Sequence, residues 1–126
     1  MLGEKNAAAT IAVKDINAAK RFYESTLGLK LKHSSEPGVL MLESGASLVL
    51  VYQSEFAGTN KATAATWDVG TDIEGVIRDL KAKGVAFEHY DMPGMKREGD
   101  VHRDGKTKAA WFKDPDGNIL AIVQSS

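Results

Sequence analysis

The chain contains no cysteine, which excludes disulfide bridges, thiolate metal ligands and cysteine nucleophiles from its chemistry. Long apolar runs are missing as well, since stretches such as Leu48 to Tyr52 are far too short to span a bilayer. A strong charge of either sign is also absent: the net charge is −1, with acids and bases mixed along the chain. No basic surface for nucleic acid or for an anionic membrane is therefore predicted.

What is present is an ordinary globular composition. The 126 residues are 43% hydrophobic and 26% charged, which suits one domain (1–126) with a sizeable core. Met1 to Ala9 has no apolar segment of signal-peptide length. Together with the lack of cysteine, this favours the cytoplasm as the location, with no nucleic-acid and no membrane partner.

Two segments have the apolar spacing and end signals of helices. The first spans about 17–27, with Asp15 or Asn17 as its N-cap and Gly28 at its C-terminal end. The second spans about 72–83, where Thr71 to Glu74 has the spacing of a capping box and Gly84 ends the helix. Its apolar residues recur at i, i+3, i+4 and i+7, which is typical of an amphipathic helix: Ile73, Val76, Ile77 and Leu80.

The remaining periodic segments are short and bounded by turn residues, which predicts strands. They are 7–13, 29–34, 39–43, 47–53, 62–69, 85–90, 107–113 and 118–124. Asp114 to Gly117 forms a tight turn between the last two, and we expect Asp114 and Asp116 to serve that turn by bonding local backbone.

The two halves of the chain repeat one pattern. Each has a strand, a helix and three strands, and Asp15-Ile16 matches Asp72-Ile73 at a distance of about 57 residues. The predicted fold class is therefore α+β, with two tandem βαβββ modules at 7–53 and 62–124. A long polar connection at 91–106 is left over, and loops of that length are usually lids or disordered.

Two motifs carry a family resemblance. The run Val13-Lys14-Asp15-Ile16, with Phe22-Tyr23 and Leu27-Gly28-Leu29 after it, resembles the first-module signature of the vicinal oxygen chelate superfamily. The ending Asp114-Pro115-Asp116-Gly117-Asn118 resembles its closing turn. The chain is thus similar to the glyoxalase, bleomycin-resistance and dioxygenase proteins over nearly its whole length.

The resemblance implies a fold and a set of functions. Its members build a cup-shaped sheet around a pocket, often as homodimers. Their enzymes, such as glyoxalases and extradiol dioxygenases, hold a divalent metal in the cup, whereas the drug-sequestering type needs none. Whether the modules pair within one chain or between two is left open.

The metal-ligand positions implied by the resemblance lack donor atoms. Counted from the matched motifs, they fall near Ala8, Val49, Ala65 and Ala121. None of these side chains can coordinate a divalent ion, which needs imidazole or carboxylate groups. We therefore expect no metal and no cofactor, and whether any reaction is catalysed stays open.

Strand alternation gives a set of candidate ligand-binding residues. We expect the smaller side chains of each strand to face the cup and the larger ones, such as Leu48, Leu50 and Tyr52, to pack on the helix. Trp67 is two residues from Ala65 and so shares its cup-facing side, whereas the side of Trp111 is not fixed by the sequence. The resulting ligand-binding set is Thr10, Val49, Val51, Gln53, Trp67, His89, Tyr90, Trp111 and Ala121.

The chain has three histidines that could take part in a site. His33 and His102 are expected at the surface, and either His89 or its neighbours Glu88 and Tyr90 could face the cup. The leading hypothesis is metal-independent binding of a small organic molecule by sequestration. The alternatives are a lyase or dioxygenase-type enzyme with a non-standard site built around His89, and a structural or interaction module whose cup is filled. The sequence does not identify the ligand.

Overall fold

The fold is described by a computed structural model for residues 1–33 and 37–124. Short helical turns are η1 (Leu2–Glu4) and the π-helical η2 (Phe22–Thr26), and the helices are α1 (Ile16–Arg21) and α2 (Ile73–Ala82). The strands are β1 (Ala9–Val13), β2 (Lys30–His33), β3 (Val39–Ser44), β4 (Ser47–Gln53), β5 (Thr63–Asp68), β6 (Phe87–Glu88), β7 (Lys96–Glu98), β8 (Val101–Asp104), β9 (Thr107–Lys113) and β10 (Ile119–Gln124). The α+β class predicted from the sequence is confirmed.

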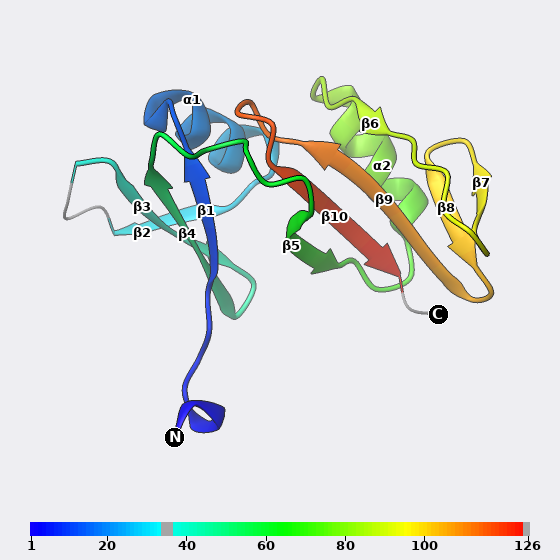
Figure 1. The fold of residues 1–126 in the computed structure, drawn as a ribbon, viewed down its shortest axis with the longest axis horizontal. Coiled ribbons are helices and arrows are strands. Elements are labelled where there is room, and N and C mark those ends of the chain that lie inside the picture. Colours follow the sequence, from blue (N-terminus) through cyan, green and yellow to red (C-terminus); the bar gives the residue numbers. More distant parts are fainter. Residues whose placement is uncertain (34–36, 125–126) are drawn as a thin grey trace.

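Two sheets lie beside each other, one from each half of the chain (Figure 1). The first has the order β1-β4-β3-β2, with β1 and β4 parallel. The second has the order β5-β10-β9-β8-β7, with β5 and β10 parallel and β6 pairing with β9. In each half of the chain, the first strand therefore pairs in parallel with the last strand. The N-terminal arm projects away from both sheets (Figure 1).

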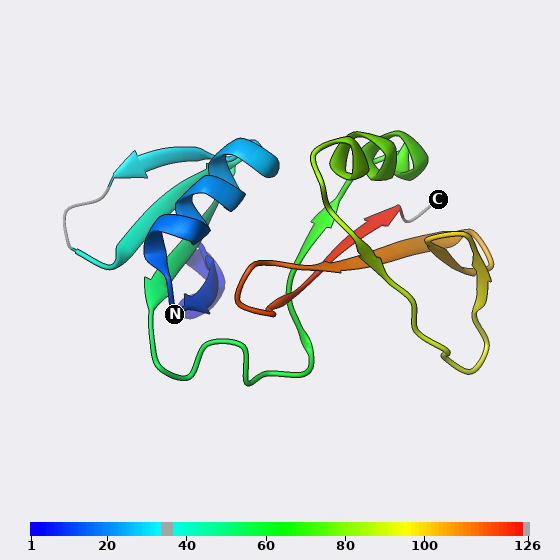
Figure 2. The ribbon, with the colours of Figure 1, turned by 90° about the horizontal axis from the view of Figure 1, so that it is seen from above.

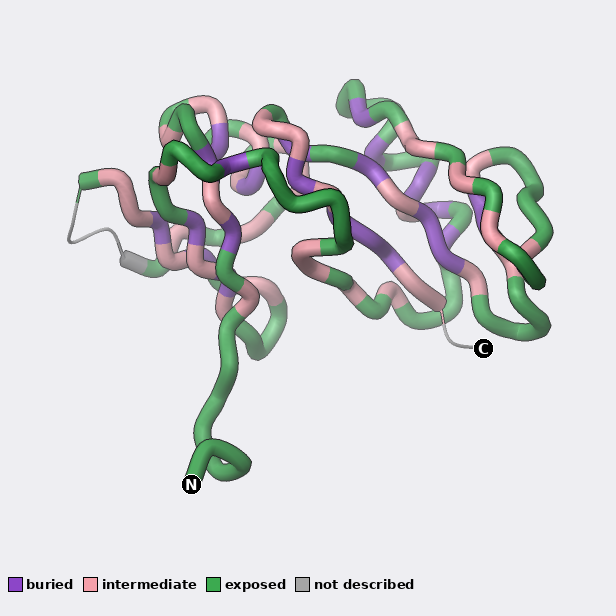
Figure 3. The backbone as a smooth tube through the Cα atoms, in the orientation of Figure 1, coloured by how far each residue is buried: buried purple, intermediate pink, exposed green. Residues whose placement is uncertain are grey.

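Each sheet buries one face against its own helix. Ile11 and Val51 are paired neighbours in the first sheet and belong to the same core as Ala19 and Tyr23 of the helical segment. The second sheet packs its buried side chains against α2, which lies along one face of that sheet (Figure 2). Most buried residues lie in the strands and helices, whereas the residues of the N-terminal arm are exposed (Figure 3). Within residues 1–33 and 37–124, no helix covers the opposite face of either sheet.

The predicted helices exist, with differences at their ends. Asp15 caps α1 by accepting from the N–H groups of Asn17 and Ala18, but the α-helical geometry ends at Arg21 and continues as η2. The N-cap of α2 is Asp72, whose carboxylate accepts from the N–H of Gly75, so the capping box predicted from Thr71 is wrong. A glycine in the third helical position has no side chain to return that bond. Among the described residues, none of the helices is both long enough and apolar enough to cross a membrane.

The predicted strands agree with the structure to within about two residues, except in the stretch after α2. There the strand expected at 85–90 shrinks to β6, and the connection at 91–106 contains the hairpin of β7 and β8. β8 extends the second sheet by pairing with β9 through His102, Arg103 and Asp104. Much of this segment is therefore a sheet edge and not an irregular loop.

Side-chain hydrogen bonds join the two halves. Tyr23 donates its hydroxyl to Asp114 Oδ2 at 2.8 Å, and the amide of Asn118 donates to the carbonyl oxygen of Ala12 at 2.7 Å. Burial and the adjacent carboxylate raise the pKa of Tyr23 far above its usual value, so the phenol keeps the proton that it donates. The seam between the sheets is thus a buried, hydrogen-bonded junction.

Candidate functional site

Three aromatic side chains gather on the face of the second sheet that α2 does not cover. The rings of Trp111 and Tyr90 are 5.6 Å apart at 78°, and those of His102 and Trp111 are 4.9 Å apart at 83°. Trp111 is paired in register with Ala121 and with Glu88. Since directly paired residues point to the same side of a sheet, Trp111, Ala121 and Glu88 share this face. We call it the open face of the second sheet.

The indole of Trp111 lies across the neighbouring strand. Its Nε1 donates to Thr63 Oγ1 at 3.2 Å, and Thr63 belongs to β5 on the far side of β10. Ala121 is the β10 residue directly opposite Trp111, and it is buried. A methyl group at this point leaves room for the ring to lie over the strand, so one face of the half-buried indole is turned away from the sheet.

His102 is buried beneath this cluster. Only 1% of its surface is exposed, so the expected surface position is wrong. Its Nε2 accepts a hydrogen bond of 2.9 Å from the N–H of Tyr90, which places the ring proton on Nδ1. Nδ1 has no partner within the described part of the chain. The pairing of β8 with β9 places His102 opposite Ala109, and a small residue there makes space for the imidazole.

His89 lies apart from this cluster. Its Nε2 is 2.7 Å from Asp100 Oδ1, and Lys81 of α2 donates to the other oxygen of the same carboxylate at 2.6 Å. These bonds, first that of Lys81, lower the pKa of Asp100 below its ordinary value. Glu88 instead pairs with Lys113 at 3.5 Å on the open face. The structure therefore does not bring His89 together with Glu88 and Tyr90, as a site built from all three needs.

The open face of the first sheet presents apolar side chains of β1 and β4, together with Thr10 and the charged, directly paired Lys30 and Glu43. Thr10 is opposite Leu50, and Ala12 is opposite Tyr52, which is 38% exposed. The expectation that Val49 and Val51 face the cup is wrong: both are buried in the core on the helix side. The larger Leu50 and Tyr52 instead occupy the open face, because β-branched residues fit closely between a sheet and a helix.

The other expected ligand-binding residues are also separated. Gln53 shares the parity of Val51 and lies exposed at the end of β4, beside Gly38. The side chain of His33 lies outside the described residues. Asp114 and Asp116 lie in the turn before β10, and Asp114 Oδ1 accepts from the N–H groups of Asp116 and Asn118 as predicted. Thr10, Tyr90, Trp111 and Ala121 thus remain on the open faces.

Trp67 faces α2 and not the open side. It is paired with Ile122, and both side chains belong to the hydrophobic core below the helix. Its indole Nε1 donates to Ser44 Oγ of the first sheet at 2.8 Å. Trp67 also lines a pocket of about 530 Å³ between the two sheets, which we call the seam pocket. A β-bulge between Ile119 and Leu120 shifts the pairing with β5, and this irregularity is not visible in the sequence.

The residues present do not fit the divalent metal that the fold family implies. Val49 and Ala65 face the helices, and the residues beside them on the open faces, such as Leu50 and Thr66, are aliphatic or carry only a hydroxyl. The described residues contain no group of three or more His, Cys, Asp or Glu side chains arranged to hold a metal ion. A single hydroxyl is a poor ligand for such an ion.

The architecture is that of an α+β protein with two paired sheets, each with one helix-covered and one open face. The model of the glyoxalase/bleomycin resistance protein/dioxygenase superfamily matches residues 6–122, and the chain belongs to that superfamily. The virulence protein STM3117 of Salmonella typhimurium is 27% identical over 124 residues, covering 90% of this chain and 79% of that protein.

Solved structures of differently named proteins share the fold. The fosfomycin resistance protein FosX of Listeria monocytogenes superposes with a TM-score of 0.72 at 14% identity, covering 98% of this chain and 92% of that one. The integron cassette protein HFX_CASS4 from a sewage-outfall metagenome has a TM-score of 0.71 at 17% identity, covering 96% and 98%. At these identities the likeness concerns the fold alone.

The residue that sequence reasoning placed most poorly is His102. Its strand β8 contains Val101 as its single aliphatic residue, so this segment lacks the apolar alternation that marks a strand in the sequence. In the structure Val101 and His102 are both buried, on opposite faces of β8, which lies between β9 and β7. The polar turn Asp104-Gly105-Lys106 between that segment and the next strand is a typical hairpin connection.

Proposed function

We propose that this protein binds a small, flat, partly apolar organic molecule without a metal ion, on the open face of the second sheet. The observation that supports this most directly is the arrangement of Trp111. Its indole lies over Ala121 and turns one ring face outward, while the ring of Tyr90 stands nearly perpendicular to it. An aromatic floor and wall of this kind can stack on a planar ligand and contact its edge.

We further propose that a second copy of the chain covers the ligand, so that the cup forms in a homodimer. The open face of the first sheet supports this, because it presents Leu50 and Tyr52 without a helix to cover them. A partly exposed apolar surface next to a ligand face is typical of an interaction site. Placed over Trp111 of a partner, it would exclude water from the bound molecule. Location in the cytoplasm stays a prediction from the sequence.

Ligand binding is tested by fluorescence titration in a buffer containing EDTA. The probe is 2-naphthol, a flat aromatic alcohol, and the protein is the Trp67→Phe variant, so that Trp111 is the reporter. We expect saturable quenching that EDTA does not reduce. The Trp111→Ala variant loses the stacking contact, so its affinity for 2-naphthol, measured by calorimetry, should be about tenfold lower. Trp67→Phe is the matched control and should stay within about twofold of the parent chain, as expected for a residue outside the site.

Two results would overturn the proposal. One is binding of 2-naphthol that Trp111→Ala leaves unchanged. The other is a stoichiometric amount of nickel, zinc, manganese or iron in protein purified without a histidine tag, which would favour the enzymatic alternative. The dimer is tested separately by sedimentation equilibrium. Leu50→Glu should shift the parent dimer to a monomer, and Lys14→Glu, at an exposed position near the same sheet, should not.

A further inference from the structure

The wall of the proposed site depends on one buried histidine. Tyr90 belongs to residues 89–95, the stretch between β6 and β7 in which no strand is formed, and we call this stretch the wall segment. Within the described part of the chain, two hydrogen bonds that involve side chains join it to the β7–β8 hairpin. One runs from the N–H of Tyr90 to Nε2 of His102 at 2.9 Å, and the other joins His89 to Asp100 at 2.7 Å. The place of the Tyr90 ring on the open face therefore depends on the ability of His102 to accept a bond.

The surroundings of His102 favour the neutral imidazole. The side chain is fully buried, and its ring packs nearly perpendicular to that of Trp111. Nε2 accepts from Tyr90, whereas Nδ1 carries the proton and has no acceptor among the described residues. A second proton on Nε2 would turn the acceptor into a donor that faces another N–H. Both ring N–H groups would then be buried without an acceptor, and a buried charge without a partner costs more still.

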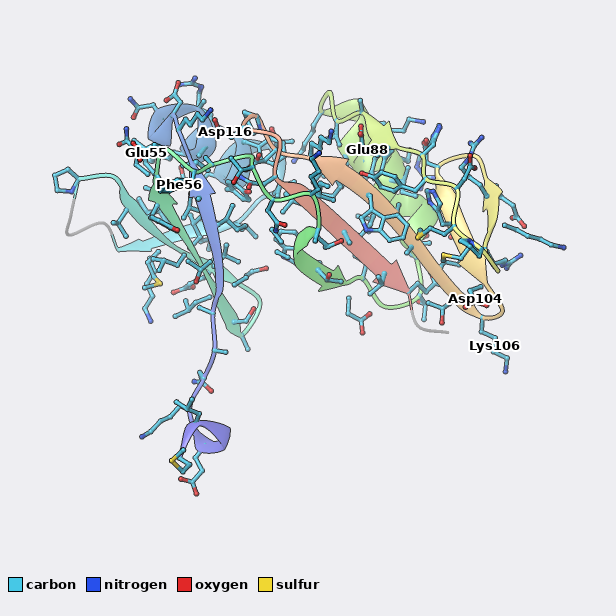
Figure 4. The ribbon with its side chains drawn as sticks, viewed as in Figure 1. Glu55, Phe56, Glu88, Asp104, Lys106 and Asp116 are labelled. Carbon is cyan, nitrogen blue, oxygen red and sulfur yellow. The ribbon has the colours of Figure 1, made fainter. Side chains whose placement is uncertain are left out.

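The charged groups around His102 do not compensate a positive charge on its ring. Within residues 1–33 and 37–124 it forms no ion pair. Arg97 of β7 is directly paired with it and carries the same sign of charge that the ring would gain. Asp104 of the same strand lies at the exposed β8–β9 turn (Figure 4). The other titratable groups of the neighbouring elements are the Tyr90 phenol, in ring contact, and charges that are exposed or already paired: Glu88 with Lys113, Asp100 with Lys81 and His89, Glu98 with Arg103, Glu74 with Lys108, and the exposed Asp91 and Lys96.

Proton uptake by His102 is therefore linked to opening of the wall segment. An imidazole in water takes up a proton at about pH 6.5. In the closed form this proton costs the bond to Tyr90, so the open form binds it more tightly. The closed form is then favoured at neutral pH and is lost as the pH falls below about 6.5.

The histidine of the wall segment itself has the opposite sign of effect. A proton on His89 strengthens its bond to the carboxylate of Asp100. The hydrogen bond from Lys81 and that from His89 lower the pKa of Asp100, so this carboxylate stays ionised at pH 5. Acidification therefore tightens the contact of His89 and weakens that of His102, which makes the two histidines distinguishable by experiment.

We propose that His102 is the positioning residue of the open face and makes its ligand binding sensitive to pH. The neutral imidazole holds the wall segment, and with it the Tyr90 ring, beside Trp111. Proton uptake at Nε2 releases this wall, so a flat ligand keeps the Trp111 floor and loses its second aromatic contact. The effect on binding rests on the proposed function, whereas the release of Tyr90 needs no ligand.

The first test uses the chain without ligand. Amide hydrogen exchange followed by NMR gives the protection factor of the Tyr90 N–H, which should fall about tenfold from pH 7.0 to pH 5.0. In His102→Gln the side-chain oxygen can accept from the same N–H and does not titrate, so protection should change by less than about twofold. His89→Gln is the matched control at the other histidine, and it should keep the tenfold fall because His102 is still present.

A second measurement follows the ring nitrogens of the parent chain, so it does not depend on the folding of a variant. Long-range ¹H–¹⁵N spectra should show the proton of His102 on Nδ1 at pH 7.0. Nε2 should become protonated over the pH range in which Tyr90 loses its protection. A proton on Nε2 at pH 7.0, or a Tyr90 amide that is equally protected at both pH values, would contradict the proposal.

The last test connects the wall to binding. In the Trp67→Phe background the affinity for 2-naphthol, which stays neutral in this range, should fall about threefold from pH 7.0 to pH 5.0. With His102→Gln added it should stay constant, and with His102→Leu, which has no acceptor, it should be about threefold lower at both pH values. An equal loss on acidification with and without His102→Gln would overturn the proposal. If 2-naphthol does not bind at either pH while Tyr90 is still released by acid, the proposed function fails and the positioning role of His102 stands.

Discussion

The two sheets have the same parallel pairing at one end and the same helix-covered face, yet their open faces differ. The first sheet presents aliphatic side chains and Tyr52, with Thr10 and the paired Lys30 and Glu43 among its polar residues. The second presents Trp111 and Tyr90 over small residues, and it is widened by the β7–β8 hairpin. One supersecondary unit, used twice, has therefore produced two different open faces, and in the proposed function one of them contacts the ligand and the other covers it.

The helix-covered faces of the two sheets, in contrast, are similar, because both are packed with buried apolar side chains. Leu42 of the first sheet and Leu120 of the second are both fully buried within one continuous hydrophobic core. The open faces can therefore diverge without changing the packing that stabilises each sheet. Variants at matched positions in the two sheets test how far this equivalence extends.

The largest effect is expected for Leu42→Ala and Leu120→Ala. Each removes a fully buried side chain, so each should lower the free energy of unfolding by about 3 kcal/mol. Because buried hydrogen bonds join the sheets, both variants should still unfold in one transition, measured by urea denaturation followed by circular dichroism. Two separate transitions in either variant would contradict this expectation. They would mean that the halves 7–53 and 62–124 unfold independently of each other.

The seam itself is probed by Asp114→Asn. This carboxylate accepts from Tyr23, from the amide of Asn118 and from two backbone N–H groups. An amide cannot accept all of these bonds, so a buried donor is left unpaired and we expect a loss of roughly 2 kcal/mol. Urea denaturation measures it, with Asp104→Asn as an exposed control that should change stability by less than about 0.5 kcal/mol. Equal stability of the two variants would contradict a structural junction.

The smallest effect concerns the edge that distinguishes the second sheet. Asp100 joins the hairpin to α2 through Lys81, and its pKa is lowered in the folded chain. Its ionised form therefore stabilises the fold above the ordinary carboxyl pKa of about 4, and this contribution is lost as the pH falls through the lower folded value. Since Lys81 is half exposed, Asp100→Asn should cost about 0.5–1 kcal/mol at pH 7.

The pH dependence separates this ion pair from a simple packing effect. Parent and Asp100→Asn should converge in stability as the pH falls from 5 toward 2.5, measured by thermal unfolding at each pH. A stability difference that stays constant across this range would show that the charge of Asp100 is not what holds the hairpin.

The fold was predictable from the sequence because its signals are local. Asp15 and Gly28 mark the ends of the first helical segment, and alternating apolar residues mark most strands. The facing of the strands was less predictable. In β4 both sets of side chains are apolar, so only their sizes distinguish the two faces, and size wrongly predicts that Leu50 and not Val51 packs against the helix. Sequence periodicity distinguishes two faces only when they differ in polarity.

The candidate site depended on nonlocal features that no single segment carries. Trp111 is positioned by Thr63 and Ala121 of two other strands, and His102 became visible only once β8 was paired with β9. Trp67 was assigned by counting from Ala65, and both residues proved to face α2. Register across the sheet fixes these positions, and register is set by turns, bulges and core packing together.

The connection between the sheets has a consequence for how copies of this protein associate. Gly58 has a φ of +74° and lies so close to the carbonyl of Asp116 that a side chain there would collide with it. Figure 4 shows the neighbouring Glu55 and Phe56 on the same connecting segment. The connecting segment is therefore packed against the β9–β10 turn, and we expect this contact to oppose hinge motion between the halves. An exchange of halves between two molecules would have to break this contact, so we expect the two halves of one chain to stay together.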